Sequence, residues 1–210
     1  MAAKIKFFFE QSWLLLVASF AFGLLLALTN AAWQPRIQQN VIERFNRLAG
    51  ALLDDAVDFE PATDEPLHIT VNGRDEAVQV QRGLDADGRT VGWAFVCRGA
   101  GFADIIELVV AVDADFETLA GFRVLSSNET PGFGDKIEIA PEENGFFQSQ
   151  FKGAPVTELT LSRTGDPEQI DDEIVAITGA TVTSQAVVNM LNAWLEPIRE
   201  TLKAEGILAQ

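Results

Sequence analysis

The sequence is poor in the residues that build metal centres and disulfides. Its 210 residues include one cysteine, Cys97, and one histidine, His68. A single thiol excludes a disulfide within the chain and a cysteine-based zinc or iron–sulfur site. Cys97 ends the strand-like run 93–97 and is expected to be a small core residue, whereas His68 is expected to face solvent on a strand. No metal site is predicted.

Positive charge is also scarce. Against 31 Asp and Glu there are only 15 Lys and Arg, which gives a formal net charge of −16. Because nucleic-acid phosphates require cationic side chains, a nucleic-acid partner is excluded. The glycine fingerprint of a dinucleotide-binding fold is absent as well, so this chain is not expected to bind NAD itself. The hydrophobic content of 48% is nevertheless enough for an ordinary core.

One long apolar segment stands near the N-terminus. Residues 11–34 contain no charged side chain and exceed the ~20 apolar residues that a membrane-spanning helix needs. Trp13 and Trp33 lie near its two ends, where interfacial aromatics are common. A cleaved signal peptide is the alternative, but the apolar run is long for one, and residues 29–33 form a weak cleavage site. A retained transmembrane anchor is therefore predicted.

The flanking charges indicate an orientation. Lys4 and Lys6 precede the anchor, which places the N-terminus in the cytoplasm by the positive-inside rule, although Arg36, Arg44 and Arg47 follow on the other side. The expected location is the bacterial inner membrane, crossed once, with the globular domain periplasmic or otherwise extracytoplasmic.

Three regions are expected: residues 1–34 as tail and anchor, 35–66 as stalk and linker, and 67–210 as one domain. Apolar residues at helical spacing from Val41 to Leu52 extend the helix to about residue 53, and the acidic residues 54–66 carry two prolines, as linkers do. Strand-like runs follow at residues 67–71, 77–82, 90–97, 105–112, 119–125 and 156–162, and residues 142–151 are expected to form a short helix or turn.

Turn and helix signals complete the fold prediction. Asn72-Gly73 and residues 85–88 are hairpin turn signals. Residues 184–203 place apolar side chains at i, i+3, i+4 and i+7, and Pro197 is expected to kink or break that helix. The fold class is α+β: an N-terminal transmembrane helix, a mainly antiparallel sheet, and a C-terminal helix.

The most informative stretch is residues 176–184, which read AITGATVTS. Four hydroxyl side chains surround a Gly-Ala pair where the last helix is expected to begin. Such a helix end favours anions, phosphate above all. An ordinary N-cap, with no ligand, is the alternative.

Two motifs resemble a known family. Thr178-Gly-Ala-Thr181, followed by Val-Thr-Ser, resembles the S/T-G-A-T-x-T-S flavinylation motif of the FMN-binding domain family, in which a flavin transferase joins FMN through its phosphate to the last Thr of S/T-G-A-T. Residues 129–137, ETPGFGDKI, resemble a loop of the Rnf complex G subunit, and residues 99–102, GAGF, are a weaker match. The similarity covers roughly residues 85–195. Where the family often has Asp, three residues before the attachment motif, this chain has Val175.

The resemblance implies a set of cofactor-binding residues and no catalytic residue. Thr181 would carry FMN covalently, Gly179 and Ala180 would let the backbone approach the phosphate, and the remaining hydroxyls would hydrogen-bond it. From the other motifs, Lys136 would neutralise the phosphate or else pair with Glu138. The full set is Thr181, Thr178, Gly179, Ala180, Thr183, Ser184, Glu129 and Thr130 (contacts to the ring or ribityl chain), Gly132 (a tight turn), Lys136, and Phe102 (stacking on the ring).

The implied function is that of an electron-transfer subunit, without complete activity alone, in an Rnf-type complex that couples ferredoxin:NAD electron transfer to ion movement. Its partners would be the other membrane subunits and, during maturation, the flavin transferase. One alternative is the C subunit of a Na⁺-translocating NADH:quinone oxidoreductase, although the short chain and Gly134-Asp-Lys136 favour the Rnf type. Another is a membrane-anchored scaffold protein without flavin.

The first prediction concerns topology. A reporter that is active only outside the cytoplasm, fused after Gln210, is expected to be active because the positive residues precede the single apolar segment. Activity of a cytoplasmic reporter alone would contradict this orientation. A mature chain beginning near Trp33 would reveal a cleaved signal peptide instead.

Overall fold

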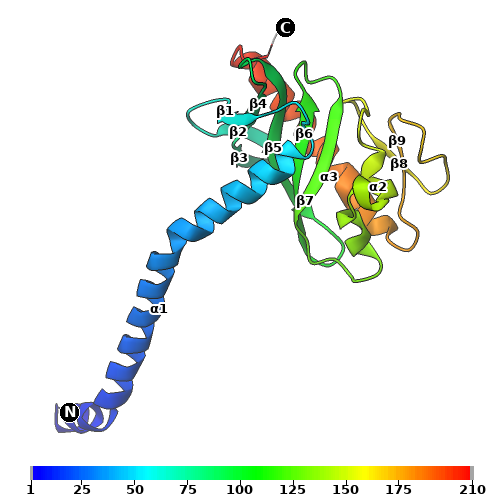
Figure 1. Cartoon of the computed structure of the whole chain (residues 1–210). Helices are drawn as coiled ribbons and strands as arrows, with labels where there is room; N and C mark the ends of the chain where they lie inside the picture. The colour runs from blue at the N-terminus through cyan, green and yellow to red at the C-terminus, as the bar shows by residue number, and fades with distance from the viewer. Residues whose placement is uncertain (1, 209–210) are drawn as a thin grey trace. The chain divides into compact units, whose positions relative to one another are not determined.

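The computed structural model describes the backbone of residues 2–208 and the side chains of residues 12–37 and 39–208. It divides between Arg44 and Phe45 into two compact units. The long helix α1 (Ala2–Gly50) provides the first unit and its last turns enter the second (Figure 1). The strands are β1 (Asp58–Pro61), β2 (Leu67–Val71), β3 (Arg74–Val78), β4 (Gln81–Leu84), β5 (Thr90–Ala100), β6 (Ile105–Asp113), β7 (Leu119–Ser126), β8 (Thr160–Ser162) and β9 (Glu173–Val175). The other helical elements are η1 (Gly134–Glu138), η2 (Pro141–Glu143), α2 (Phe146–Ser149) and α3 (Thr181–Ala204).

The first unit consists of an apolar helix. From Ser12 onward, α1 is long and apolar enough to cross a membrane, with a mean hydropathy of 2.1 in its most apolar window. The large apolar side chains of this helix are not covered by other parts of the described chain; Phe20, for example, is 73% exposed. Apolar surface on this scale suits contact with lipid hydrocarbon. The length and composition of α1 therefore agree with the membrane anchor expected from the sequence.

The second unit is built on a five-stranded antiparallel sheet in the order β1-β4-β5-β6-β7. β5 and β6 are joined by the turn 101–104, in which the N–H of Gly101 donates to the carbonyl of Asp104 at 2.8 Å. Because β6 and β7 are antiparallel, the start of β6 lies beside the end of β7, and Glu107 pairs with Ser126. The turn 101–104 and the loop after β7 therefore leave the sheet at the same end.

Helix α3 provides the main core on one face of this sheet (Figure 1). Its buried residues recur at helical spacing: Val187, Val188, Leu191, Trp194, Leu195, Ile198 and Leu202. They belong to one hydrophobic cluster with Phe95 and Cys97 of β5 and with Leu108 of β6. Burying a Val, Leu or Phe side chain contributes roughly 1.5–3 kcal/mol. The amphipathic pattern of α3 therefore fixes which side of the helix faces the sheet.

The opposite face of the sheet has a smaller core. Leu52 and Leu53, just after α1, cluster there with Ala94, Val109 and Ala111. Successive strand residues point to opposite faces, so Ala94 faces this cluster while its neighbour Phe95 faces α3. The last residues of the segment expected to form a stalk therefore belong to the core of the second unit.

Most predicted elements are confirmed. β2 has the predicted bounds, and its hairpin with β3 turns at Asn72 (φ 51°) and Gly73 (φ 76°), the positive values that a two-residue turn of this kind needs. His68 faces solvent and lies 3.0 Å from Asp75. The fold class, α+β with a mainly antiparallel sheet and a C-terminal helix, is also confirmed.

One correction concerns the linker, residues 54–66, which contains strand β1. Phe59 packs edge-on against Phe45, with ring centroids 6.5 Å apart, so this segment has an apolar anchor that the prediction overlooked. Pro61 ends the strand at the edge of the sheet, where a missing backbone N–H is tolerated.

Two further predicted strands and the helix break also differ. Residues 77–82 belong to two strands, β3 and β4, because the chain leaves the hairpin at residues 79–80 and joins the larger sheet. Only residues 160–162 of the predicted run 156–162 are in a strand, β8. Helix α3 continues through Pro197 without a break, because its apolar side is held against the sheet on both sides of the proline.

The buried thiol provides a test of this packing. Cys97 is fully buried, and burial raises the pKa of its thiol well above the ordinary value. Since the thiolate is the reactive form, iodoacetamide at pH 8 is expected to leave the folded protein unmodified and to alkylate it completely in denaturant. Mass spectrometry measures both. Rapid alkylation without denaturant would contradict the position of β5 under α3.

Candidate functional site

Three segments that are distant in the sequence converge at one cavity. They are the turn 101–104, the loop 127–135 after β7, and residues 176–184 at the start of α3. The cavity, here called the Thr181 cavity, has a volume of about 360 Å³. The predicted residues Phe102, Thr130, Gly179, Ala180, Thr181 and Thr183 line it, together with Phe133, Gly134 and Val182.

Thr181 stands where α3 begins. It is the first helical residue, and the N-cap position before it is Ala180, which has no side chain that caps the helix. The backbone N–H groups of the first helical turn point away from the helix, and the helix dipole adds partial positive charge there. Thr181 is partly exposed and lines the cavity. This combination places a hydroxyl beside a site that favours an anion.

The other hydroxyls of the motif occupy different environments. Thr183 is 2% exposed and Ser184 is fully buried. The Ser184 hydroxyl donates to the carbonyl of Ala180 at 3.0 Å and accepts from the N–H of Ile177 at 3.1 Å, so it closes the turn before the helix. Thr178 is exposed and lies outside the residues that line the cavity.

Gly179 allows this turn to pass close to the neighbouring loop. Its φ of +85° lies in the left-handed region, which favours glycine. A Cβ at this position would come within 3.1 Å of the Phe133 ring. The N–H of Ala180 donates to the carbonyl of Ile177 at 2.9 Å and completes the turn. The Gly-Ala pair of the motif therefore shapes the cavity wall.

The loop after β7 contains a second turn of the same kind. The N–H of Phe133 donates to the carbonyl of Thr130 at 3.1 Å, and Gly132 has a φ of +79°. The sequence Pro-Gly at the centre of such a turn is typical of type II. The carboxylate of Asp135 accepts from the N–H of Gly132 at 2.9 Å and braces the turn. The predicted tight turn is present, and Gly132 itself is exposed.

Glu129 points inward. It is 5% exposed, and its two oxygens bind different segments: Oε1 accepts from the N–H of Ala103 at 2.9 Å, and Oε2 accepts from the hydroxyl of Thr183 at 2.5 Å. The carboxylate lies between Gly101 and Gly134, and a Cβ added at either glycine would come within 2.7 Å of one of its oxygens. One side chain thus joins all three segments.

The turn 101–104 has an acidic residue of its own. Hydrogen bonds from the N–H of Ile105 and from the amide of Asn128 hold the pKa of Asp104 below its ordinary value. The bond to Asn128, 3.1 Å long, is a second link between this turn and the loop after β7. The exposed ring of Phe102 therefore extends from an anchored turn, and with the exposed ring of Phe133 it provides two apolar faces at the cavity.

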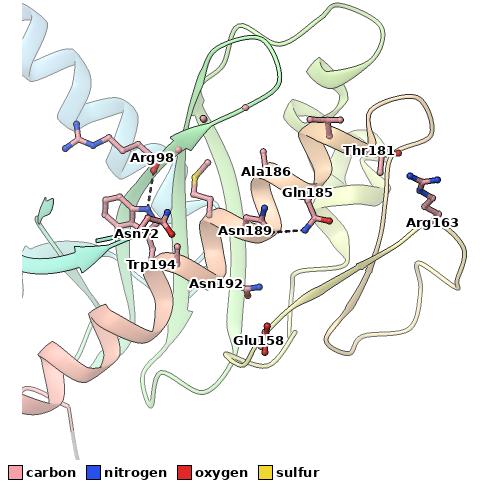
Figure 2. A pocket seen from close by; sticks show the side chains of 16 residues that line it. Asn72, Arg98, Glu158, Arg163, Thr181, Gln185, Ala186, Asn189, Asn192 and Trp194 are labelled. Atoms are coloured by element: carbon pink, nitrogen blue, oxygen red, sulfur yellow. Dashed lines mark hydrogen bonds between the residues drawn. The ribbon is translucent and has the colours of Figure 1, made fainter. Parts of the chain in front are cut away.

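The Thr181 cavity is lined by no Lys or Arg among the described residues, whereas a second cavity that Thr181 also lines contains two arginines. Lys136, in η1, is exposed and is not among the residues that line the Thr181 cavity. Thr181 and Val182 also line a larger cavity of about 960 Å³, here called the α3 cavity, to which Arg98 and Arg163 belong (Figure 2). Arg98 pairs with Glu76 at 3.0 Å. Sequence reasoning missed Arg163; its only signal was a cation within an acidic stretch.

Val175, the residue that departs from the family motif, is held in place through its backbone. It ends strand β9 and pairs with Ser162. The side chain of the buried Gln150 binds both its backbone groups: Val175 N–H donates to Oε1 at 2.7 Å, and its carbonyl accepts from Nε2 at 3.1 Å. The Gln150 side chain thus binds the backbone of β9 at Val175 as a neighbouring strand would, just before the motif.

Comparisons with known proteins match the part of the chain that contains this cavity. The model of the FMN-binding domain family matches residues 101–196, which contain all three converging segments. The G subunit of the ion-translocating oxidoreductase complex of Methanosarcina acetivorans is 34% identical over 179 residues, covering 85% of this chain and 88% of that protein. The G subunit of the Na⁺-translocating ferredoxin:NAD⁺ oxidoreductase complex of Acetobacterium woodii is 31% identical over 194 residues, 89% of each.

A solved structure shares the fold. The crystal structure of NqrC from Shewanella oneidensis matches with a TM-score of 0.55 and 25% identity, covering 72% of this chain and 73% of that one. Fold and site thus define an FMN-binding domain. The chain belongs to the family of the G subunits of ion-translocating oxidoreductase complexes. The family predicted from the two sequence motifs is confirmed.

Proposed function

We propose that this protein carries FMN, attached through its phosphate to Thr181, and passes electrons as the G subunit of a membrane-bound, ion-translocating ferredoxin:NAD oxidoreductase. The observation that carries the proposal is the position of Thr181 at the uncapped start of α3, inside a cavity formed by all the family motifs. The cofactor would supply the redox chemistry, while the chain binds and orients it.

The hydroxyl environments favour Thr181 over its neighbours as the attachment site. Thr183 and Ser184 are buried, and their hydroxyls are engaged with Glu129 and Ala180. Thr178 is exposed but lies outside the cavity lining. Among these four hydroxyls, Thr181 combines access for a modifying enzyme with a position at the helix start that stabilises phosphate.

The residues around Thr181 fit a tethered flavin. The N–H groups of the first turn of α3 would bind the phosphate, with Arg163 available from the α3 cavity to neutralise it. Phe102 and Phe133 present flat apolar faces suited to stacking on an aromatic ring, and Thr130 adds a hydroxyl. A covalent tether would keep the cofactor at high effective concentration beside its pocket outside the cytoplasm.

The proposed membrane arrangement is supported by the length and composition of α1. The proposal places α1 across the membrane with its N-terminus in the cytoplasm and the FMN-binding domain outside, in contact with the other membrane subunits of the complex. The regions proposed are residues 1–34 as tail and anchor, 35–66 as stalk and linker, and 67–210 as the domain. Strand β1 lies within the second region, so the stalk and the domain are structurally continuous after Phe45.

Two alternatives are less favoured. The C subunit of a Na⁺-translocating NADH:quinone oxidoreductase shares the fold, but the sequence similarity to the two G subunits extends over nearly the whole length of both proteins. A scaffold protein without flavin would leave the uncapped helix start and the exposed rings of Phe102 and Phe133 unused. Yellow colour that persists after acid precipitation of the purified protein would exclude the scaffold.

The attachment site can be tested directly. Thr181→Ala, produced with the flavin transferase, is expected to lose both the in-gel fluorescence of covalent flavin and the FMN mass on its peptide. The variant is expected to fold, because Ala is a good helix former. Thr181 is not the N-cap residue, a position that Ala180 occupies, so its replacement removes no helix cap. Thr181→Ser keeps a hydroxyl and is expected to retain part of the label.

Thr178→Ala is the matched control, because it removes an exposed hydroxyl from the same motif and is expected to leave the flavin in place. A flavin found on Thr183, or no adduct on the wild-type protein despite a working transferase, would show the assignment to be wrong.

The loop after β7 provides an independent test. Gly132→Val is expected to change the absorbance or the reduction potential of the bound flavin. A Cβ at Gly132 meets no atom within 4 Å, so the cost is backbone strain at positive φ, roughly 1–2 kcal/mol, and it falls on the turn beside the cavity.

Gly88→Val is the control for that strain. Gly88 has a φ of +76° and equally open space, but it lies in the hairpin between β4 and β5. It is expected to lower the stability by a similar amount and to leave the flavin spectrum unchanged. Identical spectra for both variants and the wild type would mean that the turn does not contact the cofactor.

A further inference from the structure

We infer that Glu129 is a positioning residue: it holds the first turn of α3, and with it Thr181, against the two neighbouring loops, and its charge lowers the reduction potential of a flavin held there. The part concerning potential rests on the proposed function, whereas the part concerning the loops does not. The resemblance assigned Glu129 a direct contact with the cofactor. The geometry assigns it to the layer behind the cavity wall.

The sequence makes room for this carboxylate at three positions. Gly101 and Gly134 flank it, and any side chain at either position would come within 2.7 Å of a carboxylate oxygen. Thr183 directs its hydroxyl at the carboxylate and is itself 2% exposed. Burying a carboxylate costs free energy unless it is hydrogen-bonded. The two glycines leave space for the Glu129 carboxylate, and the Thr183 hydroxyl donates a hydrogen bond to it.

The first consequence is mechanical. Thr183 and Thr181 belong to the same first turn of α3, so the bond from Thr183 to Glu129 fixes that turn relative to the loop after β7. The bond from Ala103 extends this connection to the turn that carries Phe102. The attachment hydroxyl and the aromatic ring on the adjoining turn are therefore held in register through one side chain.

The second consequence is electrostatic. Gly134 and Thr183 both line the Thr181 cavity, and both lie against Glu129, so the carboxylate stands directly behind the cavity wall. Fixed charge acts more strongly where water is excluded. Electrons added to a ring in this cavity would be repelled by the carboxylate. Asp104, on the turn 101–104, is exposed and hence better screened. Asp135 is partly exposed, and its carboxylate is engaged with the N–H of Gly132.

Glu129→Gln separates charge from hydrogen bonding. The glutamine carbonyl can still accept from the N–H of Ala103, and its NH₂ group can donate to the Thr183 oxygen. We expect the variant to fold, to accept covalent flavin, and to show a more positive flavin midpoint potential than the wild type in redox titrations. Glu138→Gln removes the same charge from an exposed side chain on η1 and is the matched control, with an unchanged potential.

Thr183→Val and Thr183→Ser test the mechanical role without the flavin. Valine replaces the hydroxyl with a methyl group of similar size and leaves a carboxylate oxygen buried without its partner, whereas serine keeps the bond. We expect Thr183→Val to raise the unfolding equilibrium constant by about tenfold or more and Thr183→Ser to raise it much less. With the transferase present, the fraction of flavinylated protein is expected to fall severalfold in Thr183→Val alone.

These measurements separate the inference from the proposed function. A wild-type protein without flavin would overturn the proposed function, and the unfolding comparison of the two Thr183 variants would still decide the mechanical role. Equal stability of Thr183→Val and Thr183→Ser would overturn that role. A flavin-loaded Glu129→Gln protein with the wild-type potential would overturn the electrostatic role. If Glu129→Gln does not fold, Gly134→Ala replaces it in the potential measurement, because the added Cβ would crowd the Glu129 carboxylate and the Thr183 hydroxyl behind the same wall. A wild-type potential in that variant would likewise overturn the electrostatic role.

Discussion

The site depends on one buried interaction, the hydrogen bond of 2.5 Å between Thr183 and Glu129, two residues 54 positions apart in the chain. Hydrogen bonds to charged groups contribute roughly 1.5–3 kcal/mol net, and losing one partner in a buried place costs at least as much. This bond, together with that from Ala103, ties a sheet turn, a loop and a helix start. The amide of Asn128 also donates to Asp104 at 3.1 Å and gives the turn and the loop a second link, but it is Glu129 that binds the helix start through the Thr183 hydroxyl.

The sheet prepares this meeting. Antiparallel pairing of β6 and β7 brings the turn 101–104 and the loop after β7 to the same end of the sheet. The amphipathic α3 lies on the face formed by β5 and β6, so its first turn reaches the same end. Sheet pairing and apolar burial therefore bring the three segments to one end of the sheet. The hydrogen bonds of the Glu129 carboxylate then join them.

The sequence was a good guide to the regular elements and to the family, but not to the environments of individual residues. Alternating and helical patterns located β2, β5, β6, β7 and α3, because one face of each is buried. The pattern did not reveal β1, since it is a short edge strand held by Phe59, or the parallel pair β8–β9, which depends on tertiary contacts. The two motifs located the cavity, yet only the fold distinguishes Thr181, which lines it, from Ser184, which closes the turn behind it.

The Thr-Gly-Ala-Thr-Val-Thr-Ser stretch can therefore be understood as a structural unit in which each position has its own task. Gly179 adopts positive φ and passes close to Phe133. Ser184 reaches back to bind the turn, and Thr183 reaches sideways to Glu129. Because both of these hydroxyls are satisfied inside the protein, neither competes for a ligand at the helix start. Thr181 then has the partly exposed hydroxyl beside the N–H groups of the first helical turn, which is an arrangement that favours an anion such as a phosphate.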